Sequence, residues 1–380
     1  MNRVVKSLLV TVLGVNSASA ANWKAADVDM FLKGYVKLDY VQVQGDGSAS
    51  AINRSLTVPV AIVNDDAGTR SGFQVLESRF GFGTQKGNTS SYIEMDFYLS
   101  ATGDENISNS FNPRLRHAYF KDCDWLFGQS WSNFMILSSL SEQLDFGGFA
   151  GQVFVRQPGI RFTKNFDKYR LDLSVENAET TYGQGEGASL SSAAADQDST
   201  PDFIGKVSHV GDYGSVAMAI MHRTHSAEDS TESKDTGVAY TFGGELRYGV
   251  GSSFKFAYSG GNLGRYGSFT TQKDAVFTTS ENTLEATETN QWHLGVRQLL
   301  TNTWRFNFDY GVGVQETFVA SSVKKVSTIR ANIIKQRSKN ISYGFEWAQA
   351  DVTRYEATKA LGESDGARGS RYMFSAKYSF

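Results

Sequence analysis

Apolar and polar side chains alternate with a period of two residues along much of this 380-residue chain. In residues 31–43, Val36 and Leu38 share one parity, and Lys37 and Asp39 share the other. Successive side chains of a β-strand point to opposite faces, so the pattern predicts strands with one apolar face and one polar face. The alternation recurs as far as the C-terminus, which predicts an all-β chain.

The connections between these strand segments alternate between short and long. Short turns are expected at 85–88, 122–124, 165–168, 211–214, 249–251, 301–302 and 338–340. Long polar connections are expected at about 44–70, 102–112, 132–152, 179–201, 226–236, 262–290, 318–324 and 351–369. About 16 strands result, and this even number predicts a transmembrane antiparallel β-barrel with short periplasmic turns and long extracellular loops. A soluble antiparallel sandwich also alternates, but it does not explain long loops on one side only.

The last strand segment carries the same pattern in its strongest form. Tyr372, Phe374 and Phe380 fall on one face, and Arg371 and Lys377 fall on the other. An aromatic strand that closes the chain on Phe resembles the terminal strand of bacterial outer-membrane β-barrels. The mean hydropathy of −0.33 fits this reading, because only half of each strand would face lipid. After residue 20 no run approaches the ~20 apolar residues of a spanning helix.

The N-terminal residues have the features of a secretory signal. Arg3 and Lys6 precede the apolar run 8–15, and Ala18-Ser19-Ala20 is a small-residue cleavage site. We therefore expect a signal peptide over residues 1–20, which agrees with a location in the bacterial outer membrane. Residues 21–30 would form a short periplasmic segment, and residues 31–380 a single barrel domain surrounded by outer-membrane lipid.

The net charge argues against two classes of binding partner, and the cysteine content excludes an internal disulfide. Without residues 1–20, 35 basic residues (37 less two) face 40 acidic ones, a formal charge of −5. This small excess favours neither nucleic acid nor an anionic membrane surface as a partner. The single cysteine, Cys123, cannot form an internal disulfide.

The polar strand faces would line a water-filled lumen, where charged groups act strongly on a passing solute. Parity places several arginines there and puts Arg114 and Arg116 on one face. The other predicted lumen arginines are Arg79, Arg297, Arg305 and Arg330. Acidic residues share these faces, so each arginine is also a candidate for a structural ion pair.

The connection 132–152 is too apolar for a solvated surface loop. It contains Phe134 to Leu137, and later a flexible turn suited to a sharp bend. We expect it to tuck into the lumen and set the constriction. The loop residues assigned to this role are Ser132, Phe134, Asp145, Phe146, Gly147 and Gly148.

Arg156 and Arg161 follow this loop and would supply cationic hydrogen-bond donors. Their parities are opposite, so both can face the lumen only if Pro158-Gly159 breaks the register with a bulge.

Three runs in this region carry a family resemblance: RLRHAYF from Arg114, FGQSWSNF from Phe127, and DFGG from Asp145 through FVRQPGIRF at 154–162. They resemble the DcaP-like family of outer-membrane porins. The resemblance implies a trimer of sixteen-stranded barrels that takes up small anionic solutes, dicarboxylates among them, through an arginine-lined constriction. The matching positions are Arg114, Arg116, Arg156 and Arg161. Family members often carry an N-terminal coiled coil, whereas about ten residues separate Ala20 from the first strand here, so a trimer would rely on barrel walls and loops.

The sequence is compatible with three other functions. A non-selective general porin is one alternative, and an adhesin-like barrel is another, although small inward residues such as Ser174 and Gly295 leave room for water. A barrel-embedded enzyme is less favoured, since no local motif joins a nucleophile to any of the five histidines. We therefore expect no catalytic residue, cofactor or metal.

Overall fold

The computed structural model describes residues 21–45, 68–98, 111–145, 147, 150–184, 198–226, 233–267, 273–278, 283–319, 323–355 and 366–380. The expected signal peptide, residues 1–20, lies outside them. Two short 3-10 turns interrupt the strands, η2 (Leu137–Ser139) and η3 (Gly264–Tyr266). Among the described residues, no helix has the length and apolar character needed to cross a membrane.

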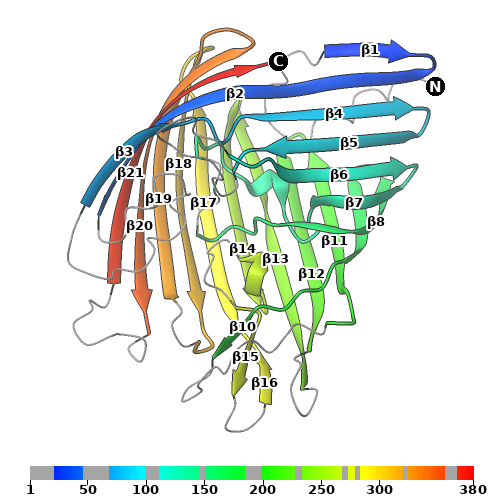
Figure 1. Ribbon diagram of the computed structural model, residues 1–380, viewed down its shortest axis with the longest axis vertical. Helices are drawn as coiled ribbons and strands as arrows, with labels where there is room; N and C mark the ends of the chain where they lie inside the picture. The colour runs from blue at the N-terminus through cyan, green and yellow to red at the C-terminus, as the bar shows by residue number, and fades with distance from the viewer. Residues whose placement is uncertain are drawn as a thin grey trace.

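The strands of the large sheet follow one another around a ring (Figure 1). Their bounds in the first half are β1 (Ala21–Ala25), β2 (Val28–Gly45), β3 (Gly68–Gln74), β4 (Arg79–Lys86), β5 (Thr89–Asp96), β6 (Arg114–Asp122), β7 (Trp125–Trp131), β8 (Arg156–Phe166) and β9 (Tyr169–Glu176). In the second half they are β11 (Asp202–Gly211), β12 (Gly214–Ser226), β13 (Lys234–Gly249), β14 (Ser252–Gly261), β17 (Thr289–Leu299), β18 (Trp304–Gln315), β19 (Val323–Gln336), β20 (Ile341–Arg354) and β21 (Gly366–Ser379).

The ring closes where the first long strand meets the last. One edge of β2 pairs with β21 from Tyr35↔Ser379 to Gly45↔Gly369, and its other edge pairs with β3 and β4. The sheet has 18 strands; setting aside β1 and counting β3 and β4 as one interrupted strand leaves 16. The structure confirms a closed antiparallel barrel of 16 strands.

The interruption between β3 and β4 corrects one detail of the predicted pattern. The period-two alternation, continued through residues 73–84 as one strand, would place Leu76 on the outer face with Phe80, but only 2% of the surface of Leu76 is exposed. The chain turns here, with the Ser78 amide donating to the Val75 carbonyl at 2.9 Å, so the parity on the two sides of the turn is unrelated. Phe80, beyond the turn, is exposed as expected.

The N-terminal residues of the described chain extend the barrel wall. Strand β1 forms a hairpin with β2, in register from Ala21↔Leu32 to Ala25↔Val28. Strand β21 follows one edge of β2 as far as Phe380, whose backbone exchanges hydrogen bonds of 3.0 and 3.1 Å with Gly34. Strand β1 lies along the same edge of β2, beyond that point. The C-terminus thus ends at the short-turn side of the barrel (Figure 1).

The two faces of the wall have the predicted chemistry. On β21, Phe374 is 56% exposed on the outside, whereas its neighbours Met373 and Ser375 are buried against the interior. The same division holds on β2, where Val36 and Leu38 are exposed and Lys37 is buried. Exposed apolar side chains therefore cover the outer surface, as a barrel wall in lipid requires.

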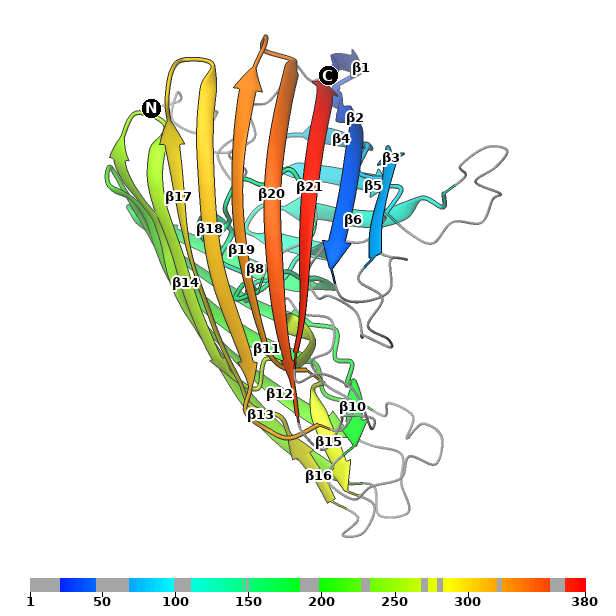
Figure 2. The ribbon, with the colours of Figure 1, turned by 90° about the vertical axis from the view of Figure 1, so that its left-hand side faces the viewer.

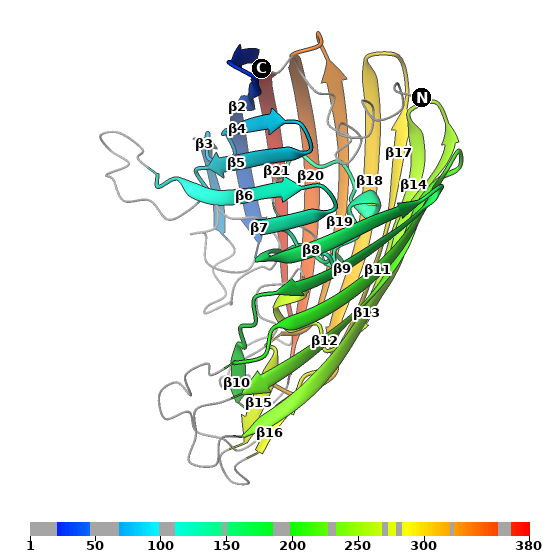
Figure 3. The same cartoon turned by 90° about the vertical axis from the view of Figure 1, so that its right-hand side faces the viewer.

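A second, smaller sheet lies at the end opposite the C-terminus (Figure 2). It consists of β10 (Tyr182–Gln184), β15 (Ala275–Thr278) and β16 (Thr283–Ala286), which come from two of the predicted long connections. Turn η2, from the connection that follows β7, lies instead inside the ring of strands (Figure 3).

Candidate functional site

The described residues of the segment 132–155, here called the lumen loop, fold against the inner wall of the barrel. Phe134 and Met135 are buried in an apolar cluster with Ile204, Met221 and Tyr266. These partners belong to β11, β12 and η3, so the start of the loop contacts one side of the ring. Burial of such large side chains explains why this connection is more apolar than the others.

Ion pairs hold the later part of the lumen loop on the opposite side. The Arg305 guanidinium donates from Nε and Nη2 to the two oxygens of Glu142, each at 2.7 Å. Asp145 lies 2.8 Å from Nη1 of Arg371 and 3.7 Å from Nη1 of Arg330. The arginines stand on β18, β19 and β21, so the loop is fixed to three strands of this wall.

Wall side chains also bind the backbone of the lumen loop. Glu346 accepts hydrogen bonds from the amides of Leu144 and Asp145, at 2.8 and 3.3 Å. The Lys37 ammonium donates to the Leu144 carbonyl. His293 places its two ring nitrogens 2.9 and 3.0 Å from the carbonyls of Gly151 and Ser139, and a neutral imidazole donates one of these two bonds.

The surroundings of the two loop carboxylates keep them ionised. Burial alone would raise the pKa of Glu142, but hydrogen bonds and charge from Arg305 outweigh it, so this pKa lies below its usual value of 4.5. The pKa of Asp145 is lowered in the same way, because Arg371 and Arg330 outweigh the effect of burial. Both loop anchors are therefore charged pairs at neutral pH.

A cluster of arginines occupies the inner face of β4 to β6. Arg116 donates to Glu94 at 2.6 Å and to Asp96 at 2.8 Å, and Arg114 holds Asp96 through two bonds of 2.8 and 2.9 Å. Arg79 lies 3.6 Å from Glu94. Each carboxylate is thus shared by two arginines.

A β-bulge sets the direction of these side chains. Glu94 pairs with His117 and the next residue, Met95, pairs with Leu115, so Arg116 is the extra residue of β6. Arg116 and His117 are consequently both buried, while Leu115 is exposed outside. Arg114 and Arg116 share the inner face, as predicted.

Trp131 connects Arg156 and Arg161 to this cluster. The Arg156 guanidinium carbon lies 3.5 Å from the centre of the Trp131 ring, and Arg116 lies 5.9 Å from it. Arg161 donates to the Trp131 carbonyl at 2.5 Å. The bulge expected at Pro158-Gly159 was wrong, because β7 and β8 pair without a break from Trp131↔Arg156 to Trp125↔Phe162.

Strand β7 changes face along its length. Trp125 and Phe127 stack on the outer side, whereas Trp131 contacts Phe154 at 4.9 Å in the interior. Gly128 lies between them with a φ of 118°, a conformation that favours glycine.

The residues predicted to line the constriction therefore form two groups. Arg79, Arg114, Arg116, Arg156 and Arg161 lie on the side of β4 to β8, while Arg305 and Arg330 bind the lumen loop from β18 and β19. Arg297 approaches Glu142 to 3.8 Å. Ser132 and Phe134 begin the loop, and Gly147 donates to Asp145 at 3.2 Å. Phe146 and Gly148 lie outside the described residues.

Charge is distributed unevenly between the two groups. On the side of β4 to β8, Arg79, Arg114, Arg116 and Arg156 surround Glu94 and Asp96, and Arg161 lies 3.9 Å from Glu176, so five arginines face three carboxylates. The opposite group is balanced, with six cations and six carboxylates among the described residues: Lys37, Arg297, Arg305, Arg330, Arg371 and Lys377, and Asp39, Glu77, Glu142, Asp145, Asp309 and Glu346. The excess of arginine over carboxylate therefore lies on the side of β4 to β8.

Sequence reasoning did not identify two residues of this site. Trp131 carries Arg156 on its ring, and Glu142 receives the Arg305 pair. Glu142 had one visible signal, since it is a carboxylate beside an apolar stretch of a loop that was expected to be inside the barrel. Trp131 had none, because its orientation depends on the change of face within β7.

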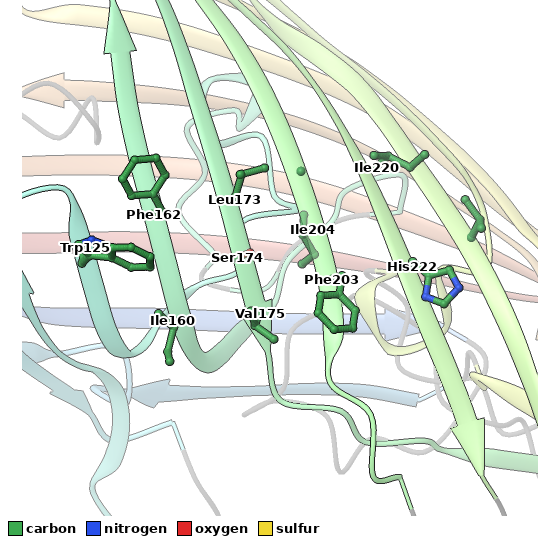
Figure 4. Close-up of a pocket in the computed structure, with 12 residues that line it drawn as sticks. Trp125, Ile160, Phe162, Leu173, Ser174, Val175, Phe203, Ile204, Ile220 and His222 are labelled. Atoms are coloured by element: carbon green, nitrogen blue, oxygen red, sulfur yellow. The ribbon is translucent and has the colours of Figure 1, made fainter.

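A hollow lies on the outer wall of the barrel, in a different environment from the lumen (Figure 4). It measures about 740 Å³, and apolar side chains of β8 to β13 form most of it, including Leu173, Phe203 and Ile220. These residues are exposed on the lipid-facing side of the strands, so the hollow is separate from the lumen.

Comparison with known proteins identifies the fold. No protein-family model and no curated protein matches the chain. Among solved structures, the outer membrane channel DcaP of Acinetobacter baumannii is 20% identical, with a TM-score of 0.80 over 95% of this chain and 100% of that one. OmpT of Vibrio cholerae is 9% identical (TM-score 0.58, 95% and 100% covered), and an anion-selective porin from Comamonas acidovorans is 11% identical (TM-score 0.57, 93% and 100% covered). This chain therefore has the fold of outer-membrane porin channels, and it is DcaP-like in architecture.

Proposed function

We propose that this protein is a bacterial outer-membrane porin, a water-filled channel through which small hydrophilic anions pass by diffusion. The observation that carries the proposal is the excess of arginine over carboxylate on one side of the lumen, facing a balanced wall on the other. A narrow aqueous path with low-dielectric walls concentrates the field of such a cluster on a passing ion. Dicarboxylates are the solutes that the family resemblance favours.

The lumen loop is the element that we assign to the constriction. It enters the barrel and is fixed to both sides of it, by an apolar cluster at Phe134 and by ion pairs at Glu142 and Asp145. Replacing residues 137–149 by a short glycine linker should raise single-channel conductance in a planar bilayer. An unchanged conductance and selectivity would remove the loop from the proposal.

Arg156 provides the direct test of anion preference. Its guanidinium is held on the Trp131 ring, and Arg156→Gln removes one positive charge from the cluster. The reversal potential in a salt gradient should shift toward cations. The matched control is Lys164→Gln on the same strand, since Lys164 is half-exposed and pairs with Asp124 at 3.3 Å away from the cluster. Equal reversal potentials for the wild type and the Arg156 variant would favour a non-selective general porin.

We also propose a homotrimer in outer-membrane lipid. The support is the exposed apolar outer wall, together with the trimer form in which OmpT of Vibrio cholerae has been solved. Light scattering of the detergent-purified protein, corrected for bound detergent, should give three times the mass of one chain. A mass of one chain in mild detergent would contradict this assembly.

A further inference from the structure

A second group of cations lines the wall between the lumen loop and the short-turn end of the barrel. It consists of Lys121 on β6, Arg161 on β8, Arg170 on β9 and Lys206 on β11. Arg161 and Arg170 are among the charges that act on both lysines, which shows that the four groups form one cluster. The adjacent carboxylates are Asp172 and Glu176, so four cations face two anions.

The register of the strands puts Lys206 at the centre of this group. Lys206 lies directly opposite Asp172 in the β9–β11 pair, and Asp172 lies opposite Thr163 in the β8–β9 pair. Asp172, however, is already engaged, because it accepts hydrogen bonds of 2.6 to 2.9 Å from Arg170 and one of 2.6 Å from Thr163.

The second carboxylate is also committed to other groups. Glu176 accepts from the Asn133 amide of the lumen loop at 2.6 Å and from the Ser174 hydroxyl at 3.2 Å. Arg161 reaches Glu176 only at 3.9 Å and uses its shorter bond for the Trp131 carbonyl. Both hydrogen bonds of Glu176 use Oε1, and neither acid has an oxygen within 4.0 Å of a lysine ammonium, so the two carboxylates offset only part of the four positive charges.

The two lysines consequently lack a close anion in the described part of the chain. The Lys206 ammonium has a long contact of 3.5 Å to the Met135 carbonyl, and no carboxylate oxygen within 4.0 Å. Lys121 is exposed, and its ammonium lies 5.7 Å from the centre of the Tyr119 ring. Lys206 is half-buried, and a half-buried ammonium among like charges is energetically costly unless an anion approaches it.

We infer that Lys206, together with Lys121 and Arg161, forms a second anion-binding site that takes the carboxylate or phosphate group of a solute after it passes the lumen loop. This inference rests on the proposed channel function and deepens it. The ammonium and guanidinium groups would donate charge-assisted hydrogen bonds to the oxyanion. Arg161 connects this site to the Arg156 cluster, because it donates to the carbonyl of Trp131, whose ring carries Arg156. The site therefore continues the path from the Arg156 cluster toward the short-turn end.

The experiment measures how anion current saturates with concentration in single channels. The purified wild-type protein is compared with Lys206→Gln in potassium acetate and, separately, in potassium phosphate. Loss of the site should raise the half-saturating concentration roughly fivefold, the size expected for a partly screened ion pair. Lys206→Arg should restore the wild-type value. A rise in acetate alone assigns the site to carboxylates, and a rise in phosphate alone assigns it to phosphates.

Two further variants keep the outcome decisive. Lys121→Gln should give a smaller rise of the same sign, and it tests the site even if Lys206→Gln does not assemble. Lys234→Gln, at the far end of β13, is the matched control for the loss of one lysine. Wild-type saturation in both salts for the Lys206 and Lys121 variants would overturn the inference. Failure of Arg156→Gln to alter selectivity, with the Lys206 effect intact, would instead count against the proposed constriction.

Discussion

The guanidinium of Arg305 and the carboxylate of Glu142 are joined by two hydrogen bonds of 2.7 Å, although 163 residues separate them in sequence. Arg305 stands on the barrel wall and Glu142 on the lumen loop, so this bidentate pair fixes the position of the loop across the interior. Bidentate pairs of this type restrict geometry as well as adding energy. The position of the loop is thus determined by charged side chains in addition to its apolar anchor.

Glu142→Gln should loosen the lumen loop without unfolding the barrel. The change removes one partner of a partly buried pair and leaves Arg305 with a weaker acceptor, at a cost of about 2 kcal/mol in loop anchoring. We expect larger fluctuations of the open-channel current in planar bilayers. Glu285→Gln, an exposed carboxylate on β16, should behave as wild type. Wild-type current noise in the Glu142 variant would contradict the anchoring role.

The loop anchors should also respond to acid. Glu142 and Asp145 have pKa values below their usual values in the folded protein, so their contribution to stability is complete above about pH 4.5 and is lost as the pH falls through the lowered pKa values. Conductance should therefore be constant from pH 7 to about 4.5 and change below it. In the double variant Glu142→Gln/Asp145→Asn this acid transition should disappear. A transition near neutral pH that the double variant retains would assign it to other groups.

Trp131 should be required for its ring and not for its size alone. Trp131→Leu removes the face on which Arg156 lies and leaves a smaller side chain in the core, at a cost of roughly 3 kcal/mol. We expect a lower thermal unfolding temperature and a weaker anion preference. Trp131→Phe keeps an aromatic face and should recover most of the selectivity. If the Leu and Phe variants are equally selective, the stacking of Arg156 is unimportant for permeation.

Asp274 should stabilise the connections at the end of the barrel opposite the C-terminus. It accepts from Arg223 at 2.5 Å, from the Thr181 amide and hydroxyl at 2.8 and 2.6 Å, and from the Arg265 amide at 3.0 Å. Asp274→Asn would leave the buried Arg223 without its closest charge partner, at a cost of about 3 to 5 kcal/mol. Limited proteolysis of the folded barrel should become faster. Glu288→Gln, an exposed change at the same end, serves as the control, and equal cleavage rates would refute the role of Asp274.

The exposed Cys123 gives a test of orientation. It lies in the short turn between β6 and β7, with a φ of 51°, on the same side as the C-terminus. In the proposed location this side faces the periplasm, so a large impermeant maleimide should not label intact cells. Glu288→Cys in a Cys123→Ser background should be labelled, because it lies at the other end. Labelling of Cys123 in intact cells would reverse the assigned topology.

The number of strands and the direction of their faces could be predicted because both follow from a local rule. A period of two residues fixes which side chains point outward, and Phe374 against Met373 shows the rule at work in β21. The rule failed where the backbone leaves the ideal strand. Leu76 falls in a turn between β3 and β4, the expected bulge at Pro158-Gly159 is not formed, and neither the bulge at Arg116 nor the change of face near Gly128 was predicted.

The partners within the candidate site could not be predicted, because they depend on contacts between distant segments. Parity placed Arg305 inside the barrel, but only the fold of the lumen loop brings Glu142 to it. Similarly, Arg156 was assigned from sequence, whereas its position on Trp131 depends on the end of a neighbouring strand. Long-range ion pairs and stacking of this kind have no local signal.

The proposed function requires that water and anions pass through this barrel beside the arginine cluster. The measurement that tests it most directly is the reversal potential of single wild-type channels in a tenfold potassium chloride gradient, where a perfectly anion-selective pore would approach about 59 mV. We predict discrete channel openings and a reversal potential on the anion side of zero. A potential on the cation side, or no conductance from correctly folded protein, would contradict the account.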